Sequence, residues 1–343
     1  MKIEVLAHDG SPLGVTEKTI WGDSKQVGVG GAELALLTLC AEWVKLGHEV
    51  VLYNDPREMN VSSFEQRKIA DFEPKMDRDI LINFRSPNPM STLSTVKGKK
   101  IWWSTDQYSV GDYAKFSSYM DEIVVISPFH SDHFRSAYGI NGVHVIDIPV
   151  RVDDYNIDVP KIKNRLIFTS VPDRGLDNLL KAWPMVLMFV KDASLVITSD
   201  YRLWGVPHAN NEHFRVKWMR TKNVMFHGAL PRKAFIKEEL AADVFAYPSS
   251  YDELFCISCA EAQYAGAYPV TSTTGALRTT NMGIKVEGVS SDRGFSRTFA
   301  EEIAKVLSDR DELKMMQQDI RTKARDRFHP DKILKSWDRV FNL

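Results

Sequence analysis

Short apolar runs alternate with helical patterns along almost the whole chain, and this alternation limits the possible folds more than any other feature. Each run is nearly continuous in apolar residues, as expected for a parallel strand that is covered on both faces. The first series of predicted strands comprises residues 3–7, 50–53, 80–84, 101–103, 123–127 and 143–146. The second series comprises residues 165–169, 195–198, 224–227, 244–247, 268–271 and 284–286. Repeated strand–helix units build doubly wound α/β sheets, so we predict this fold class.

A polar, irregular segment at residues 149–163 separates the two series. The 343 residues of the chain suffice for two domains of ordinary size. We therefore predict a first α/β domain over residues 1–150 and a second over residues 151–328. A last helix is predicted for residues 329–343, because His329-Pro330 interrupts the helical pattern that precedes it.

The composition is that of a soluble globular protein, with 44% hydrophobic and 26% charged residues. No apolar run approaches the ~20 residues that a transmembrane helix requires. The apolar N-terminus is short and carries Glu4, which argues against a signal peptide. Three cysteines do not make a disulfide framework, so we expect a reducing compartment. These features predict a cytoplasmic protein, either free or peripheral to a membrane.

Charge is distributed unevenly between the two predicted domains. Residues 1–150 hold 15 Lys and Arg against 20 Asp and Glu, whereas residues 151–343 hold 29 against 25. The acidic first half gives no strong signal for binding nucleic acid or anionic lipid. The second half is basic and is therefore the better candidate for holding an anionic ligand.

Two glutamates eight residues apart form the most informative local motif. Glu253 follows a loop signal, and Glu261 lies inside a small apolar helical run. A helix that opens near Glu253 would separate the two by about 12 Å. Its first free N–H groups would be those of Leu254, Phe255 and Cys256, and such groups attract anions. Carboxylates on both sides of an anion site fit the hydroxyls of a nucleotide sugar around its diphosphate.

Two further segments have features of phosphate sites. Gly28, Gly30 and Gly31 precede a predicted helix, where glycine lets the backbone approach a ligand and the helix N-terminus favours an anion. Arg174 precedes Gly175 directly after a predicted strand. Its guanidinium could pair with both phosphates of a diphosphate.

Together these segments resemble the signatures of the family 4 retaining glycosyltransferases. Residues 247–270 resemble the E-x7-E signature of that family. Residues 28–33, followed by residues 46–50, are similar to its N-terminal signature, and residues 170–176, followed by Trp183-Pro184, to its donor-phosphate segment. The matches fall in the expected order and cover nearly the whole chain.

The resemblance implies two Rossmann-like domains that face each other across a cleft, the GT-B fold, with a C-terminal helix crossing back to the first domain. It also implies that the chain transfers a hexose, with retention of anomeric configuration, from a UDP-, GDP- or ADP-linked sugar to an acceptor hydroxyl. The acceptor is not identified by the sequence and can be a glycan, a lipid-linked sugar or a small molecule. No cofactor other than this donor is expected.

The resemblance also implies roles for individual residues. Glu253 and the nearby backbone N–H groups would orient the sugar, and Glu261 would hold the ribose hydroxyls. Arg174, with Gly30 and Gly31, would hold the diphosphate. No protein nucleophile is evident.

One departure from the family pattern concerns the phosphate site. Relatives commonly have lysine at the position of Arg174 and a second basic residue five positions earlier, where this chain has Thr169-Ser170. Either hydroxyl and backbone groups such as those of Ser170 substitute for the second cation, or another side chain supplies it. The candidates for that second cation are Arg202, Arg232 and Lys233.

A second departure concerns the first domain. Many relatives carry a histidine that touches the sugar just after the strand predicted for residues 101–103, and this chain has none there. Asp106 is our candidate for that contact, although it can equally cap a loop. These departures leave a non-catalytic GT-B module, which binds a nucleotide or a partner, as the alternative function.

Three other patterns have residue types found in metal or redox sites. Cys256 and Cys259 form a C-x-x-C pair, but their place in an apolar helix favours packing over thiol chemistry. His130 and His133 lack a third ligand, which favours a surface helix over a metal site. The D-x-D strings at residues 77–79 and 309–311 do not follow buried strands. We therefore expect no essential metal.

Overall fold

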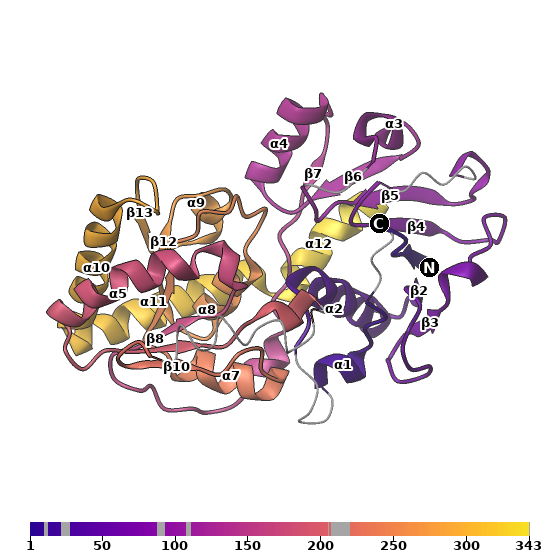
Figure 1. Ribbon diagram of the computed structural model, residues 1–343. Coiled ribbons are helices and arrows are strands. Elements are labelled where there is room, and N and C mark those ends of the chain that lie inside the picture. The colour runs from indigo at the N-terminus through magenta and orange to yellow at the C-terminus, as the bar shows by residue number, and fades with distance from the viewer. Residues whose placement is uncertain are drawn as a thin grey trace. The chain divides into compact units, whose positions relative to one another are not determined.

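The computed structural model describes residues 1–9, 13–21, 28–87, 93–107, 111–204, 206 and 220–342 (Figure 1). The chain divides into two compact units. Unit 1 comprises Met1–Ile20, Gly31–Pro149 and Pro330–Leu343, and unit 2 comprises Trp21–Gly30 and Val150–His329. The glycine-rich segment before residue 31 is thus grouped with the second unit.

Unit 1 is built on a seven-stranded, fully parallel sheet in the order β3-β2-β1-β4-β5-β6-β7. The strands are β1 Lys2–Leu6, β2 Glu49–Tyr53, β3 Glu65–Arg67, β4 Ile80–Phe84, β5 Lys99–Trp103, β6 Glu122–Val125 and β7 His144–Val145. The helices are α1 Glu17–Trp21, α2 Gly31–Lys45, α3 Tyr113–Ser117, α4 Pro128–Tyr138 and α12 Pro330–Phe341. The strand order reverses between β1 and β4, which makes this the switch point of the sheet.

Unit 2 is built on a six-stranded, fully parallel sheet in the order β10-β9-β8-β11-β12-β13. The strands are β8 Arg165–Phe168, β9 Ser194–Ile197, β10 Val224–Phe226, β11 Val244–Tyr247, β12 Tyr268–Ser272 and β13 Ile284–Val286. The helices are α5 Leu176–Phe189, α7 Arg232–Ala241, α8 Ile257–Tyr264, α9 Leu277–Thr280, α10 Arg293–Ser308 and α11 Arg310–Phe328. Its switch point lies between β8 and β11, and the predicted doubly wound α/β class is confirmed.

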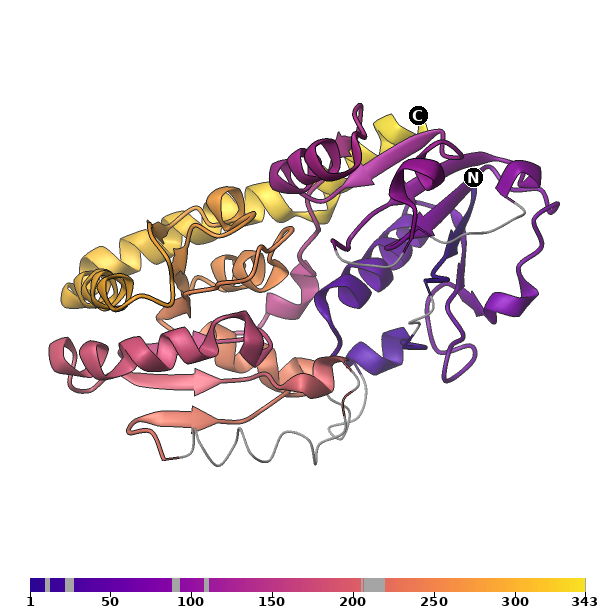
Figure 2. The same ribbon diagram turned by 45° about the horizontal axis from the view of Figure 1, so that its top comes forward.

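The C-terminal helix α12 belongs to unit 1, as predicted, and packs beside α2 (Figures 1 and 2). Trp337 is buried there, with its ring centroid 5.4 Å from that of Trp43 on α2 and 5.5 Å from that of Trp103 on β5. Both pairs are edge-to-face, the arrangement that the aromatic quadrupole favours. These contacts hold the end of the chain against the first sheet.

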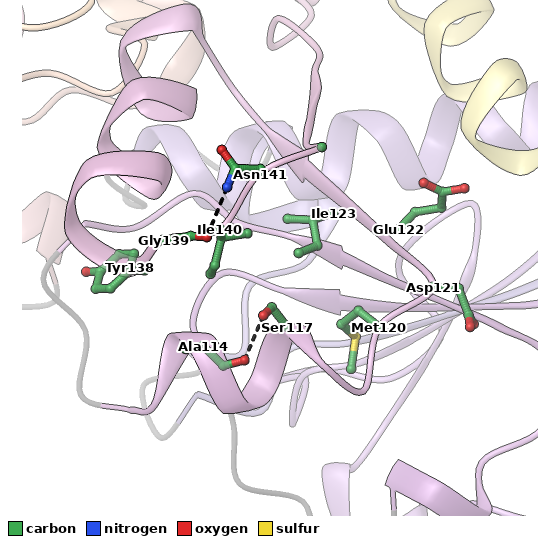
Figure 3. A pocket seen from close by; sticks show the side chains of 11 residues that line it. Ala114, Ser117, Met120, Asp121, Glu122, Ile123, Tyr138, Gly139, Ile140 and Asn141 are labelled. Carbon is green, nitrogen blue, oxygen red and sulfur yellow. Dashed lines mark hydrogen bonds between the residues drawn. The ribbon is translucent and has the colours of Figure 1, made fainter.

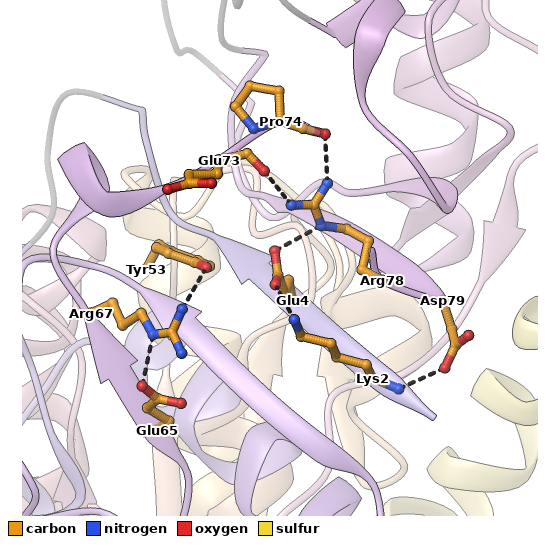
Figure 4. A network of polar contacts seen from close by, with 9 residues as sticks. All are labelled: Lys2, Glu4, Tyr53, Glu65, Arg67, Glu73, Pro74, Arg78 and Asp79. Atoms are coloured by element: carbon orange, nitrogen blue, oxygen red, sulfur yellow. Dashed lines mark hydrogen bonds and ion pairs between the residues drawn. The ribbon is translucent and has the colours of Figure 1, made fainter. Parts of the chain in front are cut away.

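A buried ion pair anchors the centre of the first sheet (Figure 4). Arg78 Nε donates to Glu4 Oε2 on β1 over 2.7 Å, and both side chains are almost fully buried. The remaining guanidinium N–H groups of Arg78 donate to the carbonyl oxygens of Glu73 and Pro74. Because these donors are used within the fold, the pair serves structure and offers no free charge to a ligand.

A surface pocket of about 470 Å³ lies in unit 1 (Figure 3). Residues of α3 and the turn after it line one part, and residues 138–142 line another. Asp121 and Glu122 place this pocket at the amino end of β6. The switch point of a parallel sheet lies at the carboxyl ends of its strands, so this pocket is at the opposite edge from the candidate site residues of the unit.

Candidate active site

The turn from β8 into α5 places Arg174 at the switch point of the second sheet. Gly175 has φ +119°, and a Cβ at this position would lie 2.6 Å from the carbonyl oxygen of Pro248. Only glycine therefore fits, and its absence of a side chain lets the turn lie directly against the end of β11. The sequence thus brings Arg174 next to the loop that carries Glu253.

Arg174, in the turn after β8, forms an ion pair with Glu253, in the loop after β11. Arg174 Nη1 lies 3.3 Å from Oε1 and 3.2 Å from Oε2 of Glu253. The guanidinium also stacks on Tyr251, with its carbon 4.3 Å from the ring centroid. Burial opposes the charge of Arg174, but the attraction of Glu253 outweighs it, so the pKa of the guanidinium is raised and the group stays charged.

Two hydroxyls complete the cluster around Glu253. The hydroxyl of Tyr247, the last residue of β11, lies 2.5 Å from Glu253 Oε1 and 3.1 Å from Ser170 Oγ. The side chain of Glu253 is 6% exposed, whereas that of Arg174 is 29% exposed. The structure therefore brings together three predicted residues, Ser170, Arg174 and Glu253, and adds Tyr247, which sequence reasoning had missed.

The prediction that a helix opens near Glu253 is wrong. Helix α8 begins at Ile257, and Cys256 precedes it in a left-handed conformation with φ +70°. Leu254 and Phe255 are buried before the helix, and the ring of Phe255 packs 5.8 Å from that of Phe328. The apolar run that looked like a first helical turn instead inserts into the core. The first free N–H groups of α8 are consequently those of Ile257 and Ser258.

Glu261 lies on α8, within a buried charged network in which Arg232 hydrogen-bonds to its Oε1. Arg232 Nε also donates to Asp154 Oδ2 over 2.8 Å. Burial opposes the charge of Arg232, but Glu261 and the other negative groups keep its pKa well above the ordinary value. Sequence reasoning had missed this arrangement, because Arg232 was considered only as a phosphate cation.

A second carboxyl group extends this network. Glu239 on α7 is fully buried and accepts a hydrogen bond of 2.7 Å from the Tyr155 hydroxyl. Burial, and then the negative charge of Glu261, raise the pKa of Glu239 well above its usual range. The environment of Glu239 therefore favours its neutral form, while Glu261 is the carboxyl group that pairs with Arg232.

The candidates for a second phosphate-binding group differ in their partners and in their distance from the Arg174 cluster. Arg202 is paired with Asp200 through Nε and Nη2, at 2.9 and 2.7 Å. Arg232 is paired with Glu261 and Asp154. Lys233 is exposed on α7. The hydroxyl of Ser170, in contrast, lies in the same cluster as Arg174 and Glu253, which favours the hydroxyl alternative.

In unit 1, Asp106 lies after β5, close to the carboxyl edge of the sheet. Its Oδ1 accepts from the backbone N–H of Gln107, and its Oδ2 lies 3.5 Å from the Ser86 hydroxyl. Arg85, after β4, pairs with Glu33 in the first turn of α2 and lies 3.5 Å from Asp9. Sequence reasoning had missed this group of charges around the β1–β4 switch point.

Among the remaining candidates for metal or thiol chemistry, the two cysteines and His130 are buried, and Asp309 caps a helix. Burial raises the pKa of both Cys256 and Cys259, so neither thiol is activated. His130 is fully buried, not on a helix surface as predicted, and burial lowers its pKa to about 3. Asp309 accepts from two backbone N–H groups at the start of α11. Among the described residues, no three His, Cys, Asp or Glu side chains are grouped as metal ligands.

Two parallel α/β sheets, each with a charged cluster at its switch point, form the GT-B fold, which this chain shares with solved glycosyltransferases. Residues 161–326, just under half of the chain, match the family described as glycosyl transferases group 1. Within the part of the chain that the structure describes, no helix is both long and apolar enough to cross a bilayer.

The individual relatives have low sequence identity to this chain. A GDP-mannose-dependent monoacylated alpha-(1-6)-phosphatidylinositol monomannoside mannosyltransferase of Corynebacterium glutamicum is 26% identical, and the match covers 59% of this chain and 58% of the relative. A glycosyltransferase from Rickettsia africae has a TM-score of 0.73 at 15% identity, with 99% of this chain and 97% of that chain covered. HepE from Anabaena, solved with UDP and glucose, has a TM-score of 0.68 at 14% identity, with coverage of 100% and 99%.

Proposed function

We propose that the protein transfers a hexose from a nucleotide-diphosphate sugar to an acceptor hydroxyl, with retention of the anomeric configuration. The observation that carries this proposal is the pairing of Arg174 with Glu253 at the switch point of the second sheet. One group can bind a diphosphate and the other the hydroxyls of a sugar, and the two are in contact. Their closeness matches a donor in which the phosphate and the sugar are adjacent.

In this proposal the donor separates the ion pair. The more exposed Arg174 takes the diphosphate, and Glu253 turns to hydroxyls of the sugar. The N–H groups of Ile257 and Ser258 at the start of α8 add a partial positive charge. Glu261, four residues into α8, takes the ribose hydroxyls. The bond between sugar and phosphate then breaks, and Arg174 stabilises the charge of the departing diphosphate. The acceptor hydroxyl attacks the cationic sugar from the same face and gives its proton to the departing diphosphate oxygen.

The named substrates of the relatives suggest which donors to test first. The relative from Corynebacterium glutamicum is GDP-mannose-dependent, and HepE was solved with UDP and glucose. We propose a GDP-linked or UDP-linked hexose, with ADP-sugars as the third class. The acceptor is a glycan, a lipid-linked sugar or a small molecule. The cysteines of the chain are free, which fits the proposed cytoplasmic location, alone or at a membrane surface.

A thermal-shift screen against GDP-, UDP- and ADP-sugars tests donor binding. A ligand at 100 times its dissociation constant stabilises the folded protein by about 2.7 kcal/mol, because it binds only that state. We expect one nucleotide class to stabilise the chain and its sugar to be released slowly by hydrolysis. Binding without any hydrolysis or transfer would instead support the non-catalytic module. No stabilisation by any of the three classes would contradict the proposal.

Activity is expected to survive excess EDTA. The charge of the diphosphate is met by Arg174 and the N-terminus of α8, so a divalent cation is not needed for neutralisation. The product analysed by NMR should keep the anomeric configuration of the donor, because the segment that holds Glu253 resembles the motif of retaining enzymes. Loss of activity in EDTA that Mg²⁺ or Mn²⁺ restores would mean that the charge balance has been misjudged. An inverted product would exclude the proposed mechanism.

A further inference from the structure

We infer that Tyr247 is a positioning residue of the donor site, an inference that rests on the proposed function. Its hydroxyl holds the carboxylate of Glu253 in place when a ligand draws Arg174 away. The inference begins from the two partners of Glu253. One is the partly exposed Arg174, and the other is the fully buried Tyr247.

The two partners differ in how easily a ligand can remove them. Arg174 lies at 3.2 to 3.3 Å from the carboxylate oxygens, and its side chain is 29% exposed. An anion from solvent therefore competes for it. Tyr247 lies at 2.5 Å and is 0% exposed. Its ring packs against those of Phe168 and Phe245, at centroid distances of 5.6 and 5.5 Å. Its bond to Glu253 can thus persist in the bound state.

The direction of the hydrogen bonds follows from the groups involved. A tyrosine hydroxyl has one hydrogen, and an ionised carboxylate can only accept. Tyr247 therefore donates to Glu253, and the hydroxyl of Ser170 lies 3.1 Å from the Tyr247 oxygen. Burial, reinforced by the charge of Glu253, raises the pKa of Tyr247 well above its usual value, so it remains a donor. The chain Ser170–Tyr247–Glu253 connects the ends of β8 and β11, the two strands of the switch point.

In the part of the chain that the structure describes, two polar atoms without a hydrogen-bond partner belong to residues next to this hydrogen-bonded series. Thr169 Oγ1 and Arg174 Nε are buried, and within the described part of the molecule neither has a hydrogen-bond partner. Buried polar groups in native proteins are nearly always paired. An anionic ligand that reaches Arg174 would supply the missing partner to its Nε. Glu253 therefore has hydrogen-bond partners for its carboxylate, whereas Nε of Arg174 lacks one among the described residues. This difference is expected if Arg174 changes partner when a ligand binds and Glu253 keeps its bond to Tyr247.

The variant Tyr247→Phe tests the inference, because it removes the hydroxyl and keeps the ring. We expect kcat to fall by about 10- to 100-fold, the effect of losing a hydrogen bond to a charged group. Affinity for the free nucleoside diphosphate, which has no sugar, should change less than about twofold. The extra affinity of the nucleotide sugar over the diphosphate should shrink. Ser170→Ala should cause a smaller loss of kcat, since Tyr247 keeps its bond to Glu253.

Tyr268→Phe is the matched control. Tyr268 is the first residue of β12 and so lies at the amino ends of the strands, whereas Tyr247 lies at their carboxyl ends. The control variant should leave kcat and both affinities unchanged. A kcat of Tyr247→Phe within twofold of wild type would overturn the inference. Equal losses of kcat and of nucleoside diphosphate affinity would overturn it too, since they indicate general damage to the site. If the wild-type protein neither binds nor turns over a donor, the proposed function fails first and the inference fails with it.

Discussion

Replacement of Arg174 by alanine is expected to lower kcat/KM by about 10²- to 10³-fold, the range for removing a group that stabilises developing charge in a transition state. In the structure Arg174 is the cation in contact with Glu253, and its guanidinium is oriented by the ring of Tyr251. We also expect weaker binding of the free nucleoside diphosphate, because the leaving group keeps the charge that Arg174 meets. Steady-state kinetics and calorimetry with the diphosphate measure the two effects.

Two further variants make this prediction specific. Arg174→Lys should recover part of the activity, since it keeps the charge but loses the planar fork that can hold two phosphate oxygens. Arg165→Ala is the control, because Arg165 begins β8, at the end of the strand away from Arg174, and has no proposed role. Its Nη1 lies 2.9 Å from Glu238 Oε2. This control should leave diphosphate affinity unchanged. Full activity of Arg174→Ala would refute the assignment of the phosphate site.

The strands were predictable from the sequence because a parallel strand buried on both faces leaves a local signal. Each apolar run predicted a strand at its position, and the order of the runs implied two sheets. The exception is β3, Glu65–Arg67, a short polar strand at the edge of the first sheet. Its pairing with β2 uses backbone groups alone, so its side chains carry no sign of it.

The contacts of the candidate site were less predictable because they join residues that are distant in the chain. Arg174 and Glu253 are 79 positions apart, and Arg232 and Glu261 are 29 apart. Their types and positions followed from motifs, but which cation meets which carboxylate depends on the packing of the loops after the strands. The start of α8 was misplaced for a similar reason, since the burial of Phe255 against Phe328 overrides the local helical pattern.

Unit 1 illustrates the same limit. Asp106 was selected by its position after a predicted strand, and it does lie near the carboxyl edge of the sheet. Arg85 follows a strand equally directly, but nothing in its local sequence indicated that it would meet Glu33 and Asp9. Long-range electrostatic pairs of this kind require coordinates. The role of Asp106 in the reaction stays a prediction, which substitution by asparagine and measurement of kcat can address.

The second large effect is expected at Arg232. Arg232→Met should lower the free energy of unfolding by about 3–5 kcal/mol, because it leaves the buried carboxylate of Glu261 without its cation. Asp154 is less affected, since Arg151 Nε lies 3.7 Å from its other oxygen. Denaturant unfolding with fluorescence detection measures the loss. A decrease below about 1 kcal/mol would mean that Glu261 finds another partner and that the network is not as closed as the structure indicates.

The double variant Arg232→Met with Glu261→Met separates stability from binding. Replacing both members of a buried ion pair by apolar residues of similar size is often neutral, so much of the lost stability should return. Nucleotide affinity should not return, because the carboxylate proposed to hold the ribose is gone. The loss should be about 1.5–3 kcal/mol, the contribution of a hydrogen bond to a charged group. If the stable double variant binds nucleoside diphosphate as tightly as wild type, Glu261 is a structural partner of Arg232 and has no part in holding the ribose.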